Sequence, residues 1–335
     1  SPMFFAVVLA GCGPQHNPLP ELPAPISWEA RRGNATTRGG PLVVAHGGQG
    51  SPAVRSAAVA AAVTRAWAVL DSGGDAKDSV IAGTVVMEDD AAFNAGTGAN
   101  VRLDGRTVEC DAAIMDWTGD FGAVAGVQGF KNPILIADAV ASSEHLLIAG
   151  EGGRALGKRL GLEPGAAASD RARSKLARAV TARGGPAPSW ERLWNFERPY
   201  EEALGVALEA PRSDDQPAAT KDTVGVLARD GEGRYAAALS TGGTSTALLG
   251  RVGDVPQYGQ GLFAGPCGAV AATGKGEAII REHVAAEVYD LLCAGLDPDE
   301  SIRRATWNIG VREGVGVVAM SKRGFGARAT SQMAW

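Results

Sequence analysis

Residues 222–243 read DTVGVLARDGEGRYAAALSTGG, and this stretch decides the fold. Its two apolar halves predict two buried strands, and Asp230-Gly231-Glu232-Gly233 between them is typical of a turn. A hairpin centred on Glu232 pairs the positions that lie equally far from it on either side. The sequence therefore predicts that Thr223 and Thr241 lie side by side at the open end of the hairpin, where their side chains meet.

Strands and helices fill most of the chain on both sides of this hairpin. We expect further strands over residues 42–45, 122–129, 269–272 and 315–320, and helices over residues 51–70, 75–87, 133–142 and 276–294 and from about residue 300. Ser51 is expected to cap the first helix, with Pro52 at its first position, and Asp75 to cap the second. No repeat of 20–50 residues is present.

The composition is that of a globular chain with an excess of glycine. Of 335 residues, 46 are Gly and 18 are Pro, so glycine has about twice its usual share. The 45% of hydrophobic residues can fill a sizeable core, which excludes disordered and collagen-like chains. The net charge of -5 disfavours a nucleic-acid partner. The four Cys and four His show no metal-ligand spacing, which disfavours a zinc site.

The N-terminal residues 1–40 are interpreted as a truncated signal or lipobox followed by a proline-rich spacer. Leu9-Ala10-Gly11-Cys12 resembles a bacterial lipobox, in which the Cys is lipidated, although no basic region precedes it. This predicts a membrane tether through Cys12 and a periplasmic or envelope-anchored protein. If the lipobox is not genuine, the expected location is the cytoplasm.

Residues 163–221 differ in composition from the rest of the chain. Six prolines lie within a segment that is rich in Ala, Arg, Asp and Ser. We interpret it as a mobile connector with one or two helical turns.

Threonines with a glycine one or two residues later occur at the ends of several expected strands. Thr223, Thr241 and Thr273 all have this setting. Gly250-Arg251-Val252-Gly253-Asp254 places a guanidinium and a carboxylate three residues apart, which suits a zwitterionic amino-acid head group, although a solvated salt bridge gives the same pattern. Gly274-Lys275 fails as a P-loop because the required Gly and Ser/Thr positions hold other residues.

Eight stretches of the chain are distinctive, namely HGGQG (46–50), FNAGTG (93–98), DAAIMD (111–116), GAVAGV (122–127), DTVG (222–225), STGG (240–243), GRVGD (250–254) and ATGKGE (272–277). Together they resemble the plant-type L-asparaginase/isoaspartyl peptidase family of N-terminal nucleophile hydrolases. The resemblance runs from about Pro41 to the C-terminus and omits the connector.

This resemblance implies a four-layer αββα sandwich, an α/β layered fold, made as an inactive precursor. Cleavage between Asp222 and Thr223 would separate an α subunit, residues 41–222, from a β subunit, residues 223–335. The family's usual assembly, a dimer of αβ heterodimers, is implied in the same way, and catalysis would need no cofactor.

The resemblance also implies a role for each site residue. Thr223 would be the nucleophile, because cleavage frees its own α-amino group to act as the base. Thr241 would orient the Thr223 hydroxyl, and the Thr273 hydroxyl and the Gly274 N–H would form the oxyanion hole.

The substrate-binding residues implied by the resemblance lie in two loops. Arg251 would pair with the substrate α-carboxylate and Asp254 with its α-ammonium group, while Asn94 would lie beside the nucleophile. The loop that holds Asn94 often wraps a structural sodium in this family, although a plain surface turn is the simpler interpretation. The expected backbone carbonyl ligands are Met87, Glu88, Asp90, Phe93, Ala95 and Thr97.

The expected activity is hydrolysis of small-molecule β-aspartyl substrates, namely isoaspartyl dipeptides and L-asparagine. Glycosylasparaginase activity is the enzymatic alternative, but Gly242-Gly243 after Thr241 favours the asparaginase branch. A degenerate lipoprotein that binds amino acids or peptides is the non-enzymatic alternative. Three departures from the family pattern, Gln49, Val255 and the stretch 257–261, leave the substrate preference open.

Overall fold

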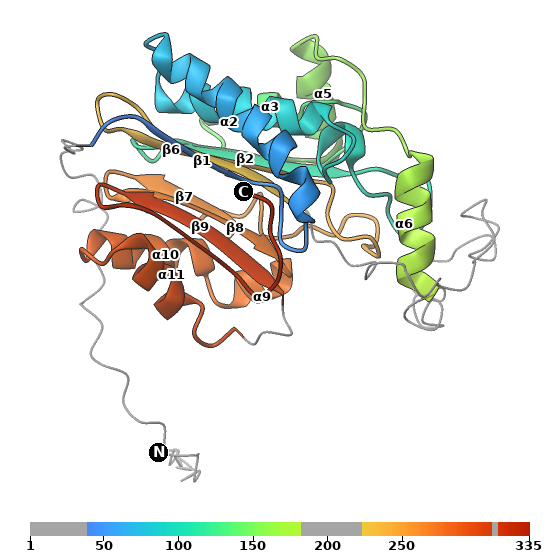
Figure 1. The fold of residues 1–335 in the computed structure, drawn as a ribbon. Helices are drawn as coiled ribbons and strands as arrows, with labels where there is room; N and C mark the ends of the chain where they lie inside the picture. The colour runs from blue at the N-terminus through green and yellow to red at the C-terminus, as the bar shows by residue number, and fades with distance from the viewer. Residues whose placement is uncertain (1–38, 182–222, 310–313) are drawn as a thin grey trace, which may run out of the picture.

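Two stacked β-sheets lie between two layers of helices in the computed structural model, which describes residues 39–181, 223–309 and 314–335 (Figure 1). The larger sheet has the strand order β1-β5-β6-β2-β3-β4 and the smaller one β10-β9-β8-β7. Helices α2, α3 and α5 cover the larger sheet, and α10 and α11 cover the smaller one. This arrangement confirms the predicted αββα sandwich.

The larger sheet places the predicted hairpin at its centre. Its strands are β1 (Leu42–His46), β2 (Cys110–Asp116), β3 (Phe121–Val127), β4 (Leu147–Ala149), β5 (Val224–Arg229) and β6 (Tyr235–Thr241). Val224 pairs with Ser240, which is the predicted register. Both β5 and β6 are buried along their whole length, because helices cover one face of the sheet and the smaller sheet covers the other.

Three helices on the larger sheet, α2, α3 and α4, were predicted from the sequence, whereas α5 was missed, α6 lies in the segment predicted to be a connector, and one expected cap is wrong. The helices in this part of the chain are η1 (Ala53–Arg55), α2 (Ser56–Asp71), α3 (Ala76–Asp89), η2 (Gly96–Gly98), α4 (Pro133–Ala141), α5 (Gly150–Arg159) and α6 (Asp170–Thr181). Asp75 caps α3 as predicted, accepting the Asp78 N–H at 2.8 Å. The prediction that Ser51 is an N-cap is wrong, because its hydroxyl instead donates to Gly48 O at 2.6 Å.

The smaller sheet and its helices come from the C-terminal third of the chain. They are β7 (Leu262–Gly265), β8 (Gly268–Gly274), β9 (Val315–Ser321) and β10 (Gly324–Ala329), with α9 (Gly276–Arg281), α10 (Val284–Cys293) and α11 (Pro298–Ala305). The single helix expected over 276–294 is wrong. His283 has a left-handed φ of 49° and separates α9 from α10, and the Ala285 N–H at the start of α10 bonds to Gln260 O.

Two hydrophobic cores result from the side-chain alternation along β6. Tyr235, Ala237 and Leu239 face the smaller sheet, whereas Ala236 and Ala238 face the helices. The small side chains let four layers stack closely around this strand. The nucleophile predicted from the sequence therefore lies at the end of a hairpin whose two strands are buried along their whole length.

One helix, Ala53–Asp71, has the length and hydropathy of a membrane span among the described residues. In the structure it includes α2, whose buried residues Val59, Ala62, Ala66 and Leu70 form one stripe. Both α3 and β1 contact α2, so this stripe packs inside the fold.

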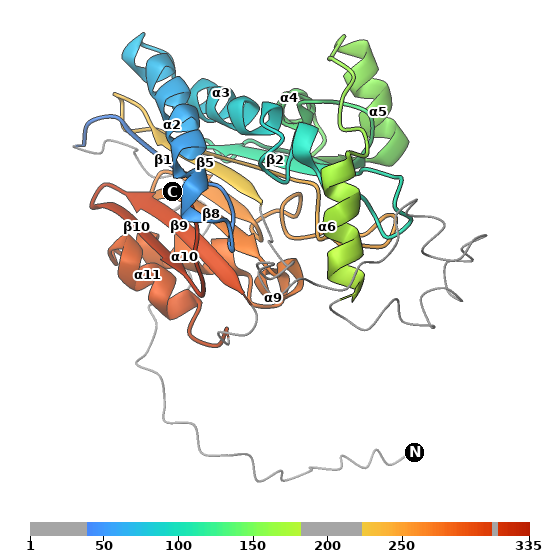
Figure 2. The same cartoon turned by 45° about the vertical axis from the view of Figure 1, so that its right-hand side comes forward.

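The first part of the predicted connector is folded, which corrects the prediction of a mobile segment over 163–221. Leu176 and Val180 of α6 are buried with Val101 and Leu103 in a third apolar cluster. Their spacing of four residues gives the helix one apolar side within an Arg-rich segment. Figure 2 shows α6 beside the main body of the fold. Residues 182–222, with Asp222, and residues 1–38, with Cys12, lie outside the described residues.

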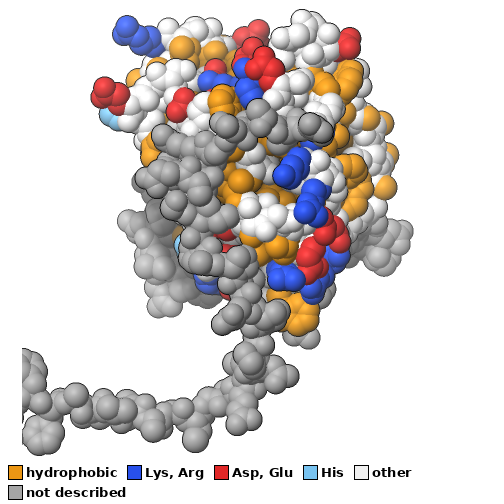
Figure 3. All heavy atoms as spheres, turned by 90° about the vertical axis from the view of Figure 1, so that its left-hand side faces the viewer, with side chains coloured by type: hydrophobic (Ala, Val, Ile, Leu, Met, Phe, Trp, Pro, Cys, Tyr) orange, Lys and Arg blue, Asp and Glu red, His pale blue; other side chains and the backbone are white. Residues whose placement is uncertain are grey.

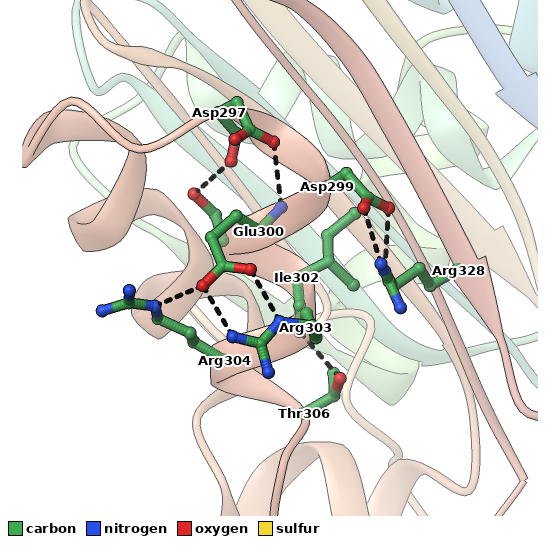
Figure 4. Close-up of polar contacts among 9 residues, drawn as sticks. Asp297, Asp299, Glu300, Ile302, Arg303, Arg304, Thr306 and Arg328 are labelled. Carbon is green, nitrogen blue, oxygen red and sulfur yellow. Dashed lines mark hydrogen bonds and ion pairs between the residues drawn. The ribbon is translucent and has the colours of Figure 1, made fainter. Parts of the chain in front are cut away.

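An ion pair between Asp299 and Arg328 joins α11 to the edge strand β10 (Figure 4). The Asp299 carboxylate accepts two bonds from Arg328, at 2.8 and 2.6 Å. Within α11, bonds from Arg303 and Arg304 lower the pKa of Glu300 to about 2. Basic and acidic side chains also lie intermixed on the face drawn in Figure 3.

A disulfide bond between Cys267 and Cys293 joins the β7–β8 turn to the end of α10. The cysteine spacing did not indicate it, because a separation of 26 residues says nothing about which elements meet in space. Cys110, the free cysteine among the described residues, is buried.

We expect the double substitution Cys267→Ala with Cys293→Ala to lower the free energy of unfolding by about 3 kcal/mol, the usual effect of opening a loop of this size. Urea unfolding measures the change. A reducing agent should destabilise the wild type to the same extent and leave the double variant unaffected. Equal stability of oxidised wild type and double variant would contradict the expectation.

Candidate functional site

The hydroxyls of Thr223 and Thr241 are in direct contact at the open end of the β5–β6 hairpin. Thr223 Oγ1 donates to Thr241 Oγ1 at 3.2 Å, and Thr241 Oγ1 also accepts the Gly243 N–H at 3.1 Å. Both threonines are buried. The contact predicted from the hairpin register is therefore confirmed.

Thr273 and Gly274 end β8, the strand of the smaller sheet that packs across β5 and β6. Thr273 is fully buried, and its Oγ1 accepts the Gln49 N–H at 3.2 Å. Gly274 has a φ of 131° and would clash with Gly314 O if it carried a Cβ, so only glycine fits there. Strand β1 pairs with β5, the strand that follows Thr223, so the loop after β1, which holds Gln49, connects the two threonine-bearing strand ends.

Arg251 and Asp254 come from the loop between β6 and β7 and converge on Gly276. A Cβ on Gly276 would lie 2.7 Å from Asp254 Oδ1 and 2.9 Å from Arg251 Nη2. The Arg251 guanidinium donates to Glu277 Oε1 at 3.1 Å from Nε and 3.0 Å from Nη2. The predicted pair is therefore assembled, with the cation held by a carboxylate of α9.

The carboxyl group of Asp254 is buried and only partly satisfied. Its Oδ2 has no hydrogen-bond partner among the described residues. Burial raises the pKa of Asp254 to about 7, and the nearby acids Asp111 and Glu277 act in the same direction against Arg251. A buried carboxylate of this kind gains most from a positively charged partner. The position therefore suits an ammonium group.

Asn94 holds the backbone that directly follows Thr241. Its Nδ2 donates to Gly243 O at 2.7 Å, and its own carbonyl accepts the Gly242 N–H at 2.9 Å. A Cβ on Gly242 would lie 2.6 Å from Asn94 Oδ1, which explains the glycine. Asn94 thus lies at the nucleophile end of β6, as predicted.

The family profile described as "Asparaginase" matches residues 39–335. The chain belongs to the asparaginase family. It is 38% identical to a plant-type L-asparaginase of Pyrobaculum calidifontis, over 84% of this chain and 91% of the relative. It is 30% identical to an isoaspartyl peptidase/L-asparaginase of Xenopus laevis, over 88% and 91%. An N(4)-(beta-N-acetylglucosaminyl)-L-asparaginase of Elizabethkingia miricola is 32% identical, over 77% and 72%.

Membership of the asparaginase family makes the chain a hydrolase with the N-terminal nucleophile fold. The four layers around the β5–β6 hairpin agree with this classification. The roles of the individual residues remain predictions that rest on their geometry.

A buried ion pair that the sequence did not indicate supports the loop that holds Arg251 in this asparaginase-family chain. Arg102, with no exposed surface, donates from Nε to Glu109 Oε2 at 2.8 Å. The same oxygen accepts the Gly250 N–H at 2.9 Å, next to Arg251. The two residues flank a tight turn at Asp104-Gly105, and the Asp-Gly pair, which is typical of a hairpin turn, was the available sequence signal.

Two further buried titratable groups lie on the same face of the larger sheet. Asp111 is the cross-strand partner of Thr241, and its Oδ1 accepts the Gly126 N–H at 2.8 Å. Burial raises the pKa of Asp111. His46 lies opposite Gly225 on β1, and burial lowers its pKa to about 4, so the imidazole is neutral. In the sequence, the signal for both residues is a polar side chain within or at the end of an apolar strand.

The loop predicted to wrap sodium follows α3 and is folded inward. Phe93, Asn94 and Ala95 are buried, which does not fit a plain surface turn. The Thr97 hydroxyl is buried without a partner among the described residues, and it adds an oxygen to the predicted carbonyl set. Burial raises the pKa of Glu88 to about 8, and its Oε1 accepts the Ser240 hydroxyl at 2.6 Å. The sodium itself stays a prediction.

We expect kcat/KM for L-asparagine to fall steeply as the pH drops below about 7. If Asp254 binds the substrate ammonium group and the Thr223 α-amino group is the base, protonation disables both, so the acid limb should approach a slope of two on a logarithmic plot. Succinamate, which lacks the ammonium, should show a slope near one. The same slope for both substrates would contradict the role of Asp254.

We expect Gly276→Ala to raise KM at least about tenfold with a smaller change in kcat, because the new Cβ displaces both head-group residues. Steady-state kinetics on L-asparagine measure both constants. Gly231→Ala is the matched control, since that glycine has open space around its Cβ position. An unchanged KM in Gly276→Ala would show that the head group binds elsewhere.

Proposed function

We propose that this chain is an autoproteolytically activated isoaspartyl peptidase/L-asparaginase. The contact between the Thr223 and Thr241 hydroxyls carries the proposal, because it sets a candidate nucleophile against a residue that orients it. The relatives named plant-type L-asparaginase and isoaspartyl peptidase/L-asparaginase support the same activity.

Maturation would cleave the chain between Asp222 and Thr223. The α subunit would then comprise residues 41–222 and the β subunit residues 223–335, with Thr223 at its N-terminus. A hydroxyl is a poor nucleophile until a base accepts its proton, and a free α-amino group has a pKa near ~7.7–8.0. Cleavage therefore supplies nucleophile and base on one residue.

The reaction would proceed through an ester on Thr223. Oγ1 attacks the side-chain carbonyl carbon of the β-aspartyl substrate while the α-amino group accepts the hydroxyl proton. The Thr273 hydroxyl and the Gly274 N–H stabilise the oxyanion of the tetrahedral intermediate. The C–N bond then breaks and the proton passes to the leaving amine. Water hydrolyses the ester by the same route, which releases aspartate and restores Thr223.

The head-group residues would decide which carbonyl reaches Thr223. Arg251 would give up one of its two hydrogen bonds to Glu277 and bind the substrate α-carboxylate instead. Asp254 would bind the α-ammonium group. Asn94 would keep the backbone beside the nucleophile in place. Recognition of both charged groups limits the substrates to those with a free aspartyl head group and a variable amine on the side-chain carbonyl.

Glycosylasparaginase activity is the second candidate, and the relative from Elizabethkingia miricola supports it. The two activities share the aspartyl head group and differ in the leaving amine. The degenerate binding protein is disfavoured, because Thr223, Thr241, Thr273 and the Arg251–Asp254 pair are all present.

We propose that the protein is exported to the cell envelope and tethered there through Cys12. The disulfide between Cys267 and Cys293 supports an oxidising compartment, because disulfides rarely persist in the cytoplasm. Fractionation of the native cells tests the proposal, and recovery of the chain in the cytoplasm with reduced cysteines would contradict it.

A structural sodium and a dimer of αβ units complete the proposal. Sodium bound by the carbonyls of residues 87–97 should raise the melting temperature relative to lithium or a bulky cation at equal ionic strength. Light scattering should give about twice the 34.2 kDa mass of one chain.

We expect the purified wild type to separate on a denaturing gel into fragments of about 23 and 11.5 kDa from the 34.2 kDa chain. Thr223→Ala should remain whole, and Thr223→Ser, which keeps a hydroxyl, should still be cleaved. The mature enzyme should hydrolyse β-Asp-Leu and L-asparagine. Hydrolysis of aspartylglucosamine alone would favour the second candidate, and an uncut, inactive wild type would refute the enzyme proposal.

A further inference from the structure

The C-terminal segment 331–335 lies along the loop formed by residues 47–51, and Figure 2 shows the C-terminus beside β1. Four hydrogen bonds connect the two segments: Gly47 N–H to Ala334 O at 2.8 Å, Gly50 N–H to Gln332 O at 2.7 Å, Ala334 N–H to Ser51 Oγ at 2.8 Å and Gln49 Nε2 to Ser331 Oγ at 2.5 Å. Met333 and Ala334 are buried in this contact.

Gln49 links this contact to the candidate oxyanion hole. Its side chain reaches Ser331, and its main-chain N–H donates to Thr273 Oγ1 at 3.2 Å. A hydroxyl has one proton and two lone pairs, so a donor that occupies one lone pair restricts the directions in which the O–H can point. Gln49 therefore affects the orientation of the Thr273 hydroxyl.

The loop around Gln49 needs support from outside itself. Gly48 and Gly50 on either side of it have φ values of 99° and 85°. Glycine adopts such positive φ values without strain, but it adopts negative φ values as easily, so the glycines do not fix the loop conformation. The C-terminal segment binds the residues before and after Gln49 as well as its side chain. The position of the Gln49 N–H thus depends on a segment that is distant in sequence.

We propose that Gln49 and the C-terminal segment 331–335 position the Thr273 hydroxyl for oxyanion stabilisation. The inference rests on the proposed function, in which Thr273 supplies one oxyanion donor. Loss of the bond between Gln49 and Ser331 should affect the transition state, in which the oxyanion forms, more than substrate binding.

The test compares variants that remove this one bond from either end. Gln49→Ala and Ser331→Ala should each lower kcat about tenfold with little change in KM, which is less than the ~10²–10³ expected for losing an oxyanion donor outright. The double variant should be no slower than the slower single variant, because both substitutions break the same bond. Rates are normalised to the amount of matured β subunit.

Two conservative variants serve as controls. Ser331→Thr keeps a hydroxyl at an exposed position and should retain the wild-type rate. Gly231→Ala, in the turn between β5 and β6, has open space around its Cβ position and should also behave as wild type. A merely structural role would lower the melting temperature without a selective loss of kcat.

Thr273→Ala separates failure of this inference from failure of the proposed function. If Thr273→Ala lowers kcat but Gln49→Ala and Ser331→Ala do not, the positioning role is wrong and the oxyanion assignment stands. If the wild type hydrolyses no β-aspartyl substrate, or Thr273→Ala retains full activity after maturation, the proposed function or its oxyanion hole fails first.

Discussion

The hydrogen bond between the Thr223 and Thr241 hydroxyls is the constraint on which the site depends. It exists because β5 and β6 pair in one register, and a shift of one residue would turn every side chain of the hairpin to the opposite face. Burial on both faces fixes that register, since Leu239 and Ala238 each fill a different core. The same strand register is therefore needed both for the packing of the four layers and for the contact between the two threonine hydroxyls.

Glycines at the site allow charged and reacting groups to approach one another. Gly276 leaves room where Arg251 and Asp254 converge, and Gly225 leaves room for the buried His46. Each of these contacts would be blocked by a single Cβ. The excess of glycine in the composition thus has a local physical cause at the ends of the strands, where the backbone must come close to other groups.

Local patterns predicted the hairpin register, the Asp75 cap and most strands, because period-two alternation and capping depend on neighbouring residues. The role of Thr273 came from the family resemblance, whereas the spacing of Arg251 and Asp254 already suited a zwitterionic head group. Contacts between distant segments had no local signal: the bond between Gln49 and Ser331 spans 282 positions. The same reason hid the Cys267–Cys293 disulfide and the break at His283, which depends on bonds to an adjacent loop. Helix α6 was missed because an Arg-rich composition outweighed two apolar residues.

Mass spectrometry of the acid-quenched enzyme during turnover of L-asparagine tests the central claim, that Thr223 forms the acyl-enzyme. The account predicts that the small fragment begins at Thr223 and carries one aspartyl group as an ester on that residue. In slow Thr241 variants, the amount of this aspartyl ester at steady state should change with the rate of turnover. An aspartyl group on another residue would contradict this claim. So would a small fragment that begins at another residue and carries no aspartyl group during turnover.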